Sequence, residues 1–228
     1  MIDRMLKKDR ITLLKLLTIL ISTFIVSRSY ATNNRELSLP FNSTKSIQLA
    51  NHYKNITNGI TELSLSETEK SRTTPFNQQE IIIPVKGENF LSPWIAKDTR
   101  YYELGQFGDK DNIFKLILYN TAGESDTSLL NIQLNSYNRK GILLDSLLLS
   151  TFFSYEDIIR FSHFKISPDY TITITITINN YVIHPYEPGE YGMTPLKKNP
   201  LPELYLQASY KIVKGRFELT RRNEFNTN

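Results

Sequence analysis

Three histidines, His52, His163 and His184, are the only side chains in the sequence whose ordinary pKa lies near neutral pH. His52 lies in a polar stretch, and His163 lies between residues that favour packing. Neither has an obvious catalytic partner close by in the sequence. An isolated histidine of this kind is more often structural or solvent-exposed than catalytic, so we interpret both as non-catalytic.

His184 opens a short motif in which His184, Glu187 and Glu190 recur every three residues. Imidazole and carboxylate groups together are acceptable ligands for zinc or a hard metal ion. On a helix this spacing would align the three groups, but Pro185 and Pro188 prevent a helix here. The three residues are therefore weak metal-ligand candidates, and we predict neither a metal site nor a cofactor.

The same segment is a better candidate for contact with a partner protein. Residues 185–202 contain five of the ten prolines in the chain, and this stretch is longer than most connections between strands or helices. Proline reduces the entropy lost on binding, and tyrosine offers a large amphipathic contact area. The alternative is a long surface connection with no role in binding. The predicted contact residues are Tyr186, Glu187, Glu190, Tyr191 and Met193.

Other sequence features of enzymes are absent or have a simpler explanation. The chain has no cysteine, so it has no thiol nucleophile, thiolate metal site or disulfide. It also lacks a Gly-x-Ser-x-Gly nucleophile elbow, a phosphate-binding loop and a dinucleotide-binding fingerprint. The acidic stretch from Gly105 to Asn112 lacks the full ligand set of a calcium loop and is typical of a turn between strands. We predict no catalytic residues, although two carboxylates distant in the sequence could still meet in the fold.

The N-terminus predicts export. Basic residues up to Lys15 precede an uncharged run from Leu16 to Val26, and Ser29-Tyr30-Ala31 supplies the small residues that a signal peptidase recognises. The apolar run is too short to span a bilayer, which takes about 20 residues. We predict that residues 1–31 are a signal peptide. The mature protein, without a transmembrane span, would then work in the bacterial periplasm or outside the cell.

Loss of that peptide would also remove the excess positive charge. The chain has 27 Lys and Arg against 23 Asp and Glu, and residues 1–31 hold six of the former and two of the latter. The remaining chain has 21 charges of each sign. Binding to nucleic acid relies on a surplus of positive charge, so we predict no nucleic-acid partner.

Residues 32–79 form a polar segment with too little apolar surface to offset the entropy of ordering it. Within it, poor helix formers such as Asn58 and Gly59 interrupt a set of apolar residues that recur at the spacing of one helix face. Two interpretations stay open, a short amphipathic helix or a segment that stays loose. The apolar residues are Leu49, Tyr53, Ile56, Ile60 and Leu63.

From Glu80 onward, a period of two predicts β-strands. In Tyr170–Ile178, isoleucine and threonine alternate, so one face of the strand is apolar and the other polar. The apolar parity switches after Asn179-Asn180, which predicts a bulge there. At an exposed edge such a strand would aggregate, so we place it inside a sheet.

A hairpin precedes this strand. Leu130–Asn135 alternates, Gly141 ends a polar turn, and Ile142–Leu149 returns with apolar residues on both faces. A return strand of this kind is typical of a sandwich or barrel that covers both of its faces. Ser154–Ile166 fits either a short helix or a bulged strand. The other predicted strands are Glu80–Lys86, Thr99–Leu104, Asn112–Tyr119, Leu204–Val213 and Arg216–Thr220.

These patterns together predict an antiparallel β-sandwich, or a related two-layer β architecture, over residues 80–222, with a short tail at 223–228. The leading functional hypothesis is an exported, non-catalytic protein that binds another protein as an inhibitor, immunity factor or accessory subunit. Two alternatives stay open. One is an envelope-polymer hydrolase that uses carboxylates, and the other is a structural subunit of a surface assembly.

Overall fold

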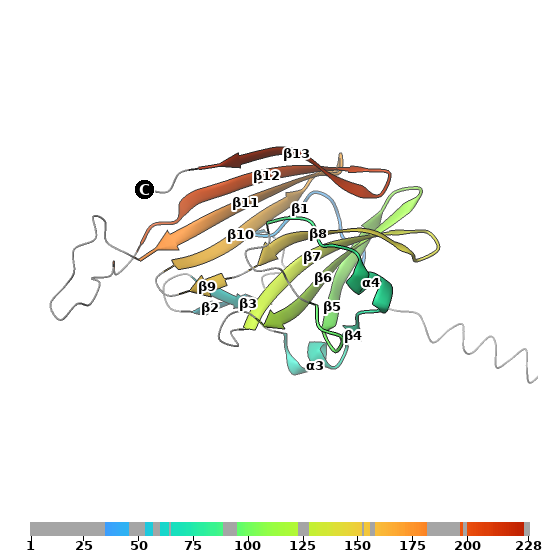
Figure 1. Ribbon diagram of the computed structural model, residues 1–228, viewed down its shortest axis with the longest axis horizontal. Helices are drawn as coiled ribbons and strands as arrows, with labels where there is room; N and C mark the ends of the chain where they lie inside the picture. Colours follow the sequence, from blue (N-terminus) through green and yellow to red (C-terminus); the bar gives the residue numbers. More distant parts are fainter. Residues whose placement is uncertain are drawn as a thin grey trace, which may run out of the picture. The chain divides into compact units, whose positions relative to one another are not determined.

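Alternating apolar and polar residues fold into two antiparallel sheets that pack face to face (Figure 1). This computed structural model describes residues 35–45, 53–56, 60–63, 65–88, 95–122, 128–151, 153–155, 158–181, 197 and 200–225. The predicted two-layer β-sandwich is confirmed. The predicted signal peptide, residues 1–31, lies outside the described residues.

Most neighbouring strands in each sheet follow one another along the chain, and the exception is β1, which pairs with β10. Sheet A consists, in order, of β4 (Thr74–Pro75), β5 (Arg100–Gly108), β6 (Asn112–Ala122), β7 (Ser128–Asn138) and β8 (Leu143–Thr151). Sheet B consists of β1 (Phe41–Asn42), β10 (Ile158–Ile166), β11 (Thr171–Asn180), β12 (Glu203–Val213) and β13 (Arg216–Glu224), and β9 (Phe153–Tyr155) also pairs with β10. The Ile/Thr strand β11 therefore lies inside its sheet, as predicted.

The core lies between the two sheets and is filled by every second residue of the central strands. Ile172, Ile174 and Ile176 of β11 face Phe114 and its neighbours on sheet A, and all are almost completely buried. Burial of one such side chain contributes about 1.5–3 kcal/mol. The apolar half of the alternating pattern is thus the main source of stability.

Part of the polar N-terminal segment also joins this core. Leu37 and Phe41 are buried in it, and the Phe41 ring stacks on Phe164 of β10 with 5.9 Å between centroids. Residues 36–228 belong to one compact unit. The two residues show that the sandwich recruits apolar side chains from before residue 80.

Two hairpin turns, of which the one at Gly141 was predicted, have glycine in a left-handed backbone conformation. Gly141 between β7 and β8 has a φ of 77°, and Gly215 between β12 and β13 has a φ of 75°. Glycine adopts this left-handed region without the steric cost that a Cβ would bring. The stretch after Gly105 likewise forms a strand end and a turn, because the Asp109 carboxylate accepts hydrogen bonds from the main-chain N–H groups of Asp111 and Asn112.

The predicted strand Glu80–Lys86 is wrong. The chain forms the short helix α4 (Gln78–Ile82) there, and only Lys86 makes a strand-like bridge, parallel to Leu147. Asn77 and Glu80 form a reciprocal capping box, a local signal that outweighed the β-branched run of isoleucines. A similar box begins α3 (Glu67–Lys70). No helix among the described residues has the length and hydropathy needed to cross a membrane.

The region expected to be helical or loose forms two short strands instead. β2 (Tyr53–Ile56) and β3 (Ile60–Leu63) pair antiparallel, and Asn58-Gly59 between them is the residue pair that hairpin turns favour. The ambiguous stretch before Ile166 is strand β10. The irregularity of β11 falls at Ile176/Thr177 in its pairing with β12, before the predicted position at Asn179-Asn180.

Candidate binding surfaces

The polar residues of β11 lie on the side of sheet B that faces away from sheet A. Thr171, Thr173 and Thr175 are half-buried there, whereas the isoleucines between them are buried in the core. We call this side the open face of sheet B. It includes Asn42, His163, Lys165, Thr171, Thr173, Thr175, Gln207, Ser209, Lys211, Glu218, Arg221 and Asn223, and it ends at Asn179, which is buried.

Strand register arranges the open face into rows that cross the whole sheet. One row runs through Asn42, Lys165, Thr173, Ser209 and Arg221, one residue from each of the five strands. Directly opposite side chains in an antiparallel pair lie about 5 Å apart. The row therefore presents the hydroxyl groups of Thr173 and Ser209 in its middle, a cation near each end and the Asn42 amide at the β1 edge.

The next row includes His163, Thr175, Gln207 and Asn223. The His163 ring meets Phe161 edge to face, with 5.2 Å between centroids. Burial lowers the pKa of His163, so the imidazole is uncharged at neutral pH. The charge of these two rows is therefore carried by Lys165 and Arg221.

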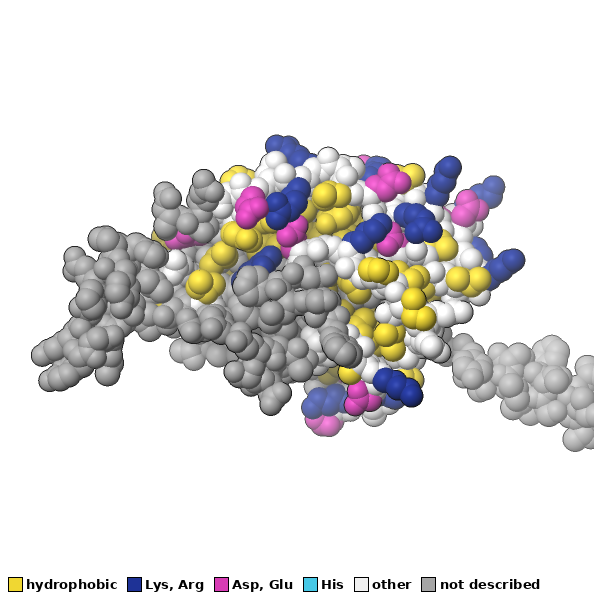
Figure 2. All heavy atoms as spheres, viewed as in Figure 1, with side chains coloured by type: hydrophobic (Ala, Val, Ile, Leu, Met, Phe, Trp, Pro, Cys, Tyr) yellow, Lys and Arg dark blue, Asp and Glu magenta, His cyan; other side chains and the backbone are white. Residues whose placement is uncertain are grey.

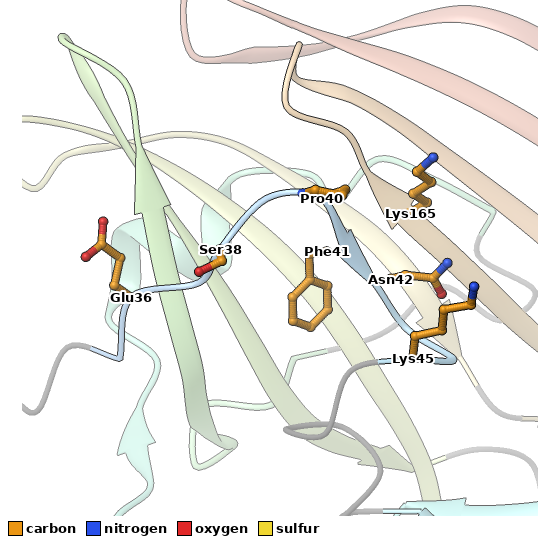
Figure 3. A pocket seen from close by; sticks show the side chains of 7 residues that line it. All are labelled: Glu36, Ser38, Pro40, Phe41, Asn42, Lys45 and Lys165. Carbon is orange, nitrogen blue, oxygen red and sulfur yellow. The ribbon is translucent and has the colours of Figure 1, made fainter.

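A hollow of about 440 Å³ adjoins the first row where β1 meets β10 (Figure 3). The Lys45 and Lys165 amino groups and the Asn42 amide point in the same direction. Among the described residues, neither lysine has a carboxylate within ion-pair distance. The hollow is lined by Glu36, Ser38, Pro40, Phe41, Asn42, Lys45 and Lys165. These groups offer donors to an anion, and sequence reasoning missed them because residues 42 and 165 are far apart in the chain.

The corresponding face of sheet A is sealed. Ile117 and Tyr119 of β6 point away from the sandwich core and pack with Phe76, Ile81 and other residues of the α4 region. Figure 1 shows α4 beside sheet A, on the side away from sheet B. The Phe76 ring contacts Tyr119 edge to face, with 5.1 Å between centroids. This cover turns the polar face of β7 into a second buried layer.

A continuous chain of hydrogen bonds satisfies the polar groups in that layer. Asn131, Gln133 and Asn135 of β7 are at most 1% exposed. The bonds run from Tyr119 Oη to Gln133 Oε1 (2.5 Å), from Gln133 Nε2 to Asn135 Oδ1 (2.7 Å), from Asn135 Nδ2 to Tyr137 Oη (3.1 Å) and from Tyr137 Oη to Glu80 Oε1 (2.5 Å). Glu80, which is 4% exposed, thus ties the cap of α4 to the sheet below it.

Burial in this layer changes the acidity of three tyrosines. Burial raises the pKa of Tyr119, Tyr101 and Tyr137 well above the ordinary value, and the nearby Glu80 carboxylate raises those of Tyr101 and Tyr137 further. All three phenols are neutral at physiological pH. They serve as hydrogen-bonding and packing groups rather than as bases.

The remaining carboxylates of note join the two sheets at one edge. Asp145 of β8 is 3% exposed, forms an ion pair with Lys86 (2.6 Å) and accepts the main-chain N–H of Phe217 of β13 (2.8 Å). Nearby, Glu88 forms an ion pair with Arg222 of β13 (2.8 Å). Sequence reasoning missed the pairing of Arg222 because residue 88 is distant in the chain.

The predicted partner-contact residues Tyr186, Glu187, Glu190, Tyr191 and Met193 lie outside the described residues, as does His184. Their segment connects β11 to β12 in sheet B. At the same end of the sheet, Ile158, Leu201 and Leu204 are exposed, Leu201 to 82%.

In the described residues, the histidines and carboxylates do not cluster. Within them, no three His, Asp or Glu side chains come together in a way that could hold a metal ion. Their accessible polar groups gather on the open face of sheet B and in the adjoining hollow. Comparisons with family models, with curated proteins and with solved structures found no match for the chain.

Proposed function

We propose that the chain is an exported, non-catalytic β-sandwich protein that binds another protein through sheet B, in the manner of an inhibitor, immunity factor or accessory subunit. The observation that carries this proposal is the open face of sheet B. It spans five strands and carries half-buried hydroxyl, amide and imidazole groups. The matching face of sheet A is covered by the chain itself.

The environment of the carboxylates favours binding over hydrolysis. A carboxylate-based glycosidase needs two carboxyl groups that flank the bond to be cleaved. Among the described residues, Glu80 and Asp145 are buried and hydrogen-bonded. Glu103 and Asp169 are in ion pairs with lysines. Each of these four carboxylates is therefore already engaged by another group of the chain.

The predicted contact loop and the open face belong to the same sheet. The loop leaves β11 and returns to β12, the two strands that carry Thr173, Thr175 and Gln207. A partner that contacts the loop could therefore extend across the face. Lys45 and Lys165 at the far edge would suit an acidic side chain of that partner.

The test is capture of the partner from the native source. The protein, tagged at its C-terminus, is purified gently from the cell envelope and medium, and co-purifying proteins are identified by mass spectrometry. We expect a stoichiometric partner that is lost when Thr173→Glu and Thr175→Glu are combined, and also when residues 186–201 are shortened. Gln79→Glu on α4, over the other sheet, is the matched control and should retain the partner.

Two results would contradict the proposal. One is full retention of the partner by both the face variant and the loop variant, provided that each melts at the wild-type temperature. The other is a solitary protein that turns over peptidoglycan or glycans and loses that activity on neutralisation of one or two carboxylates.

A further inference from the structure

The edges of the two sheets are unequally protected. The β5 edge is covered by β4 and by a bridge from Glu36 to Gln106, and the β8 edge by the bridge from Lys86 to Leu147. The β10 edge is covered by β1 and β9. Among the described residues, β13 alone is a long strand whose outer edge has no strand or bridge beside it. Figure 1 shows β13 at the outer edge of sheet B.

The open part of this edge has a defined beginning. At Phe217, the Asp145 carboxylate accepts the main-chain N–H, and Lys86 Nζ donates to the main-chain carbonyl (2.9 Å). From Glu218 to Glu224, no described residue outside the β12–β13 hairpin bonds to the main chain of β13. Unpaired N–H and C=O groups in a row are a template for a further strand.

The side chains of this stretch carry both charges and one exposed apolar group. Glu218 and Arg221 lie opposite Lys211 and Ser209 of β12, so both are on the open face, and both are exposed. The pairing of β13 with β12 shifts register between Leu219 and Arg221, so Thr220 is an extra, bulged residue, and Glu218 and Arg221 share a face although they are three residues apart. Leu219 is 52% exposed and lies on the other face. Neither Glu218 nor Arg221 has an oppositely charged partner within ion-pair distance among the described residues.

We infer that β13 pairs with β13 of a second copy of this chain, antiparallel about a two-fold axis close to Thr220. With Leu219 laid opposite Thr220 of the second copy, Glu218 meets Arg221 of that copy, and the same contact repeats across the axis. A two-fold interface makes every contact twice. The two Leu219 side chains lie next to the axis and shield one another from water.

The presence of both positive and negative charges on β13 favours pairing with a second copy of the chain over a role in which the charges only prevent pairing at this edge. An edge guarded by like charges repels a second copy of itself. In β13, the charges of Glu218 and Arg221 have opposite signs and lie three residues apart. When two copies of this strand pair antiparallel, each of these charges can therefore lie opposite a charge of the other sign. Figure 2 shows cationic and anionic side chains side by side over the upper part of the described surface.

The test measures self-association by sedimentation equilibrium over about 1–200 µM protein. We expect a monomer–dimer equilibrium in the wild type. Glu218→Arg replaces both attractive contacts with Arg–Arg repulsion and should raise the dissociation constant at least about tenfold. Arg221→Glu should do the same, and the combined Glu218→Arg/Arg221→Glu variant should return to within about threefold of the wild type.

Lys140→Glu in the β7–β8 turn makes the same change of charge as Arg221→Glu, but outside β13, and should leave the dissociation constant unchanged. Thermal melts check that each variant folds, which these exposed positions favour. A wild type that stays monomeric throughout the concentration range overturns the inference. So does a dimer that ignores both charge reversals, or a combined variant that fails to recover.

Discussion

Strands β7 and β11 carry the same alternation of apolar and polar residues, but their polar sides have different environments. Asn131, Gln133 and Asn135 of β7 are at most 1% exposed, beneath the α4 region. The threonines of β11 are half-buried on the open face of sheet B. Alternation therefore shows which residues avoid the sandwich core, and it does not show whether those residues meet water or another part of the chain.

The chemistry of the polar groups explains the difference. An amide side chain both donates and accepts hydrogen bonds, so Gln133 and Asn135 can bond to each other and to tyrosines on either side. A buried polar layer is tolerated only when its members satisfy one another in this way. Threonine has one hydroxyl and a methyl group, which suits a surface that exchanges water for a partner.

The largest effect on stability should come from breaking the buried chain of hydrogen bonds on the sealed face of sheet A. Asn135→Ala removes an amide that accepts from Gln133 and Ser146 and donates to Tyr137. Gln133 Nε2 and Ser146 Oγ then lose their acceptor, and Tyr137 keeps only its bond to Glu80. We expect a loss of about 3–5 kcal/mol in the free energy of unfolding, measured by urea denaturation.

The matched control is Thr175→Ala on the open face, which should change the free energy of unfolding by less than about 0.5 kcal/mol. Equal losses in the two variants would mean that the open face is as much a part of the fold as the sealed one. The distinction between them, and with it the basis of the proposed binding surface, would then fail.

The next largest effect should be a fall in stability at alkaline pH, which depends on the tyrosines of the sealed face and not on the open face. The pKa values of Tyr101, Tyr119 and Tyr137 are raised by folding, so above about pH 10 the unfolded chain releases protons that the folded chain retains. The free energy of unfolding then falls as pH rises, by about 1.4 kcal/mol per pH unit for each tyrosine.

Tyr119→Phe should reduce this slope by one tyrosine's share, whereas Thr175→Ala should leave it unchanged. Urea denaturation at pH 9, 10 and 11 measures both. A wild-type stability that is flat over this range would show that the tyrosines do not stay protonated in the folded protein.

Sequence periodicity predicted the architecture because the period of two is a local property. It located β11 and the β7–β8 hairpin, because apolar and polar residues alternate along most of β7 and β11. It failed at Glu80–Lys86, where three consecutive isoleucines suggest a strand but Asn77 and Glu80 cap a helix. It also failed at residues 53–63, where apolar residues three and four apart lie in two strands rather than on a helix face.

The binding surfaces depend on register, which a single sequence does not supply. Lys165 lies opposite Asn42, and Arg222 meets Glu88, only because of how the strands are ordered and aligned. The threonines of β11 were assigned to a polar face from the sequence alone, but the sealing of the equivalent face of β7 depends on Glu80, more than 50 residues away. Tertiary contacts of this kind leave no periodic signal.

The smallest effect should come from an ion pair on sheet B. A hydrogen bond from Lys211, together with bonds from Thr171, lowers the pKa of Asp169 to about 2. The folded pKa lies below the unfolded one, so the stabilisation is present above about pH 4 and is lost as pH falls toward 2. Lys211→Met should raise the pKa of Asp169 toward its ordinary value, which NMR titration of the carboxyl carbon would measure.

Because Asp169 and Lys211 are largely exposed, Lys211→Met should lower the melting temperature at pH 6 by no more than about 2 °C. That difference should shrink at pH 2, where the carboxylate of the wild type also becomes protonated. A cost as large as that of Asn135→Ala would place a main source of stability on sheet B's exposed side. Contributions to stability would then differ between individual contacts and not between the sealed face and the open face. A face that is free to bind a partner should carry side chains whose loss costs the fold little stability.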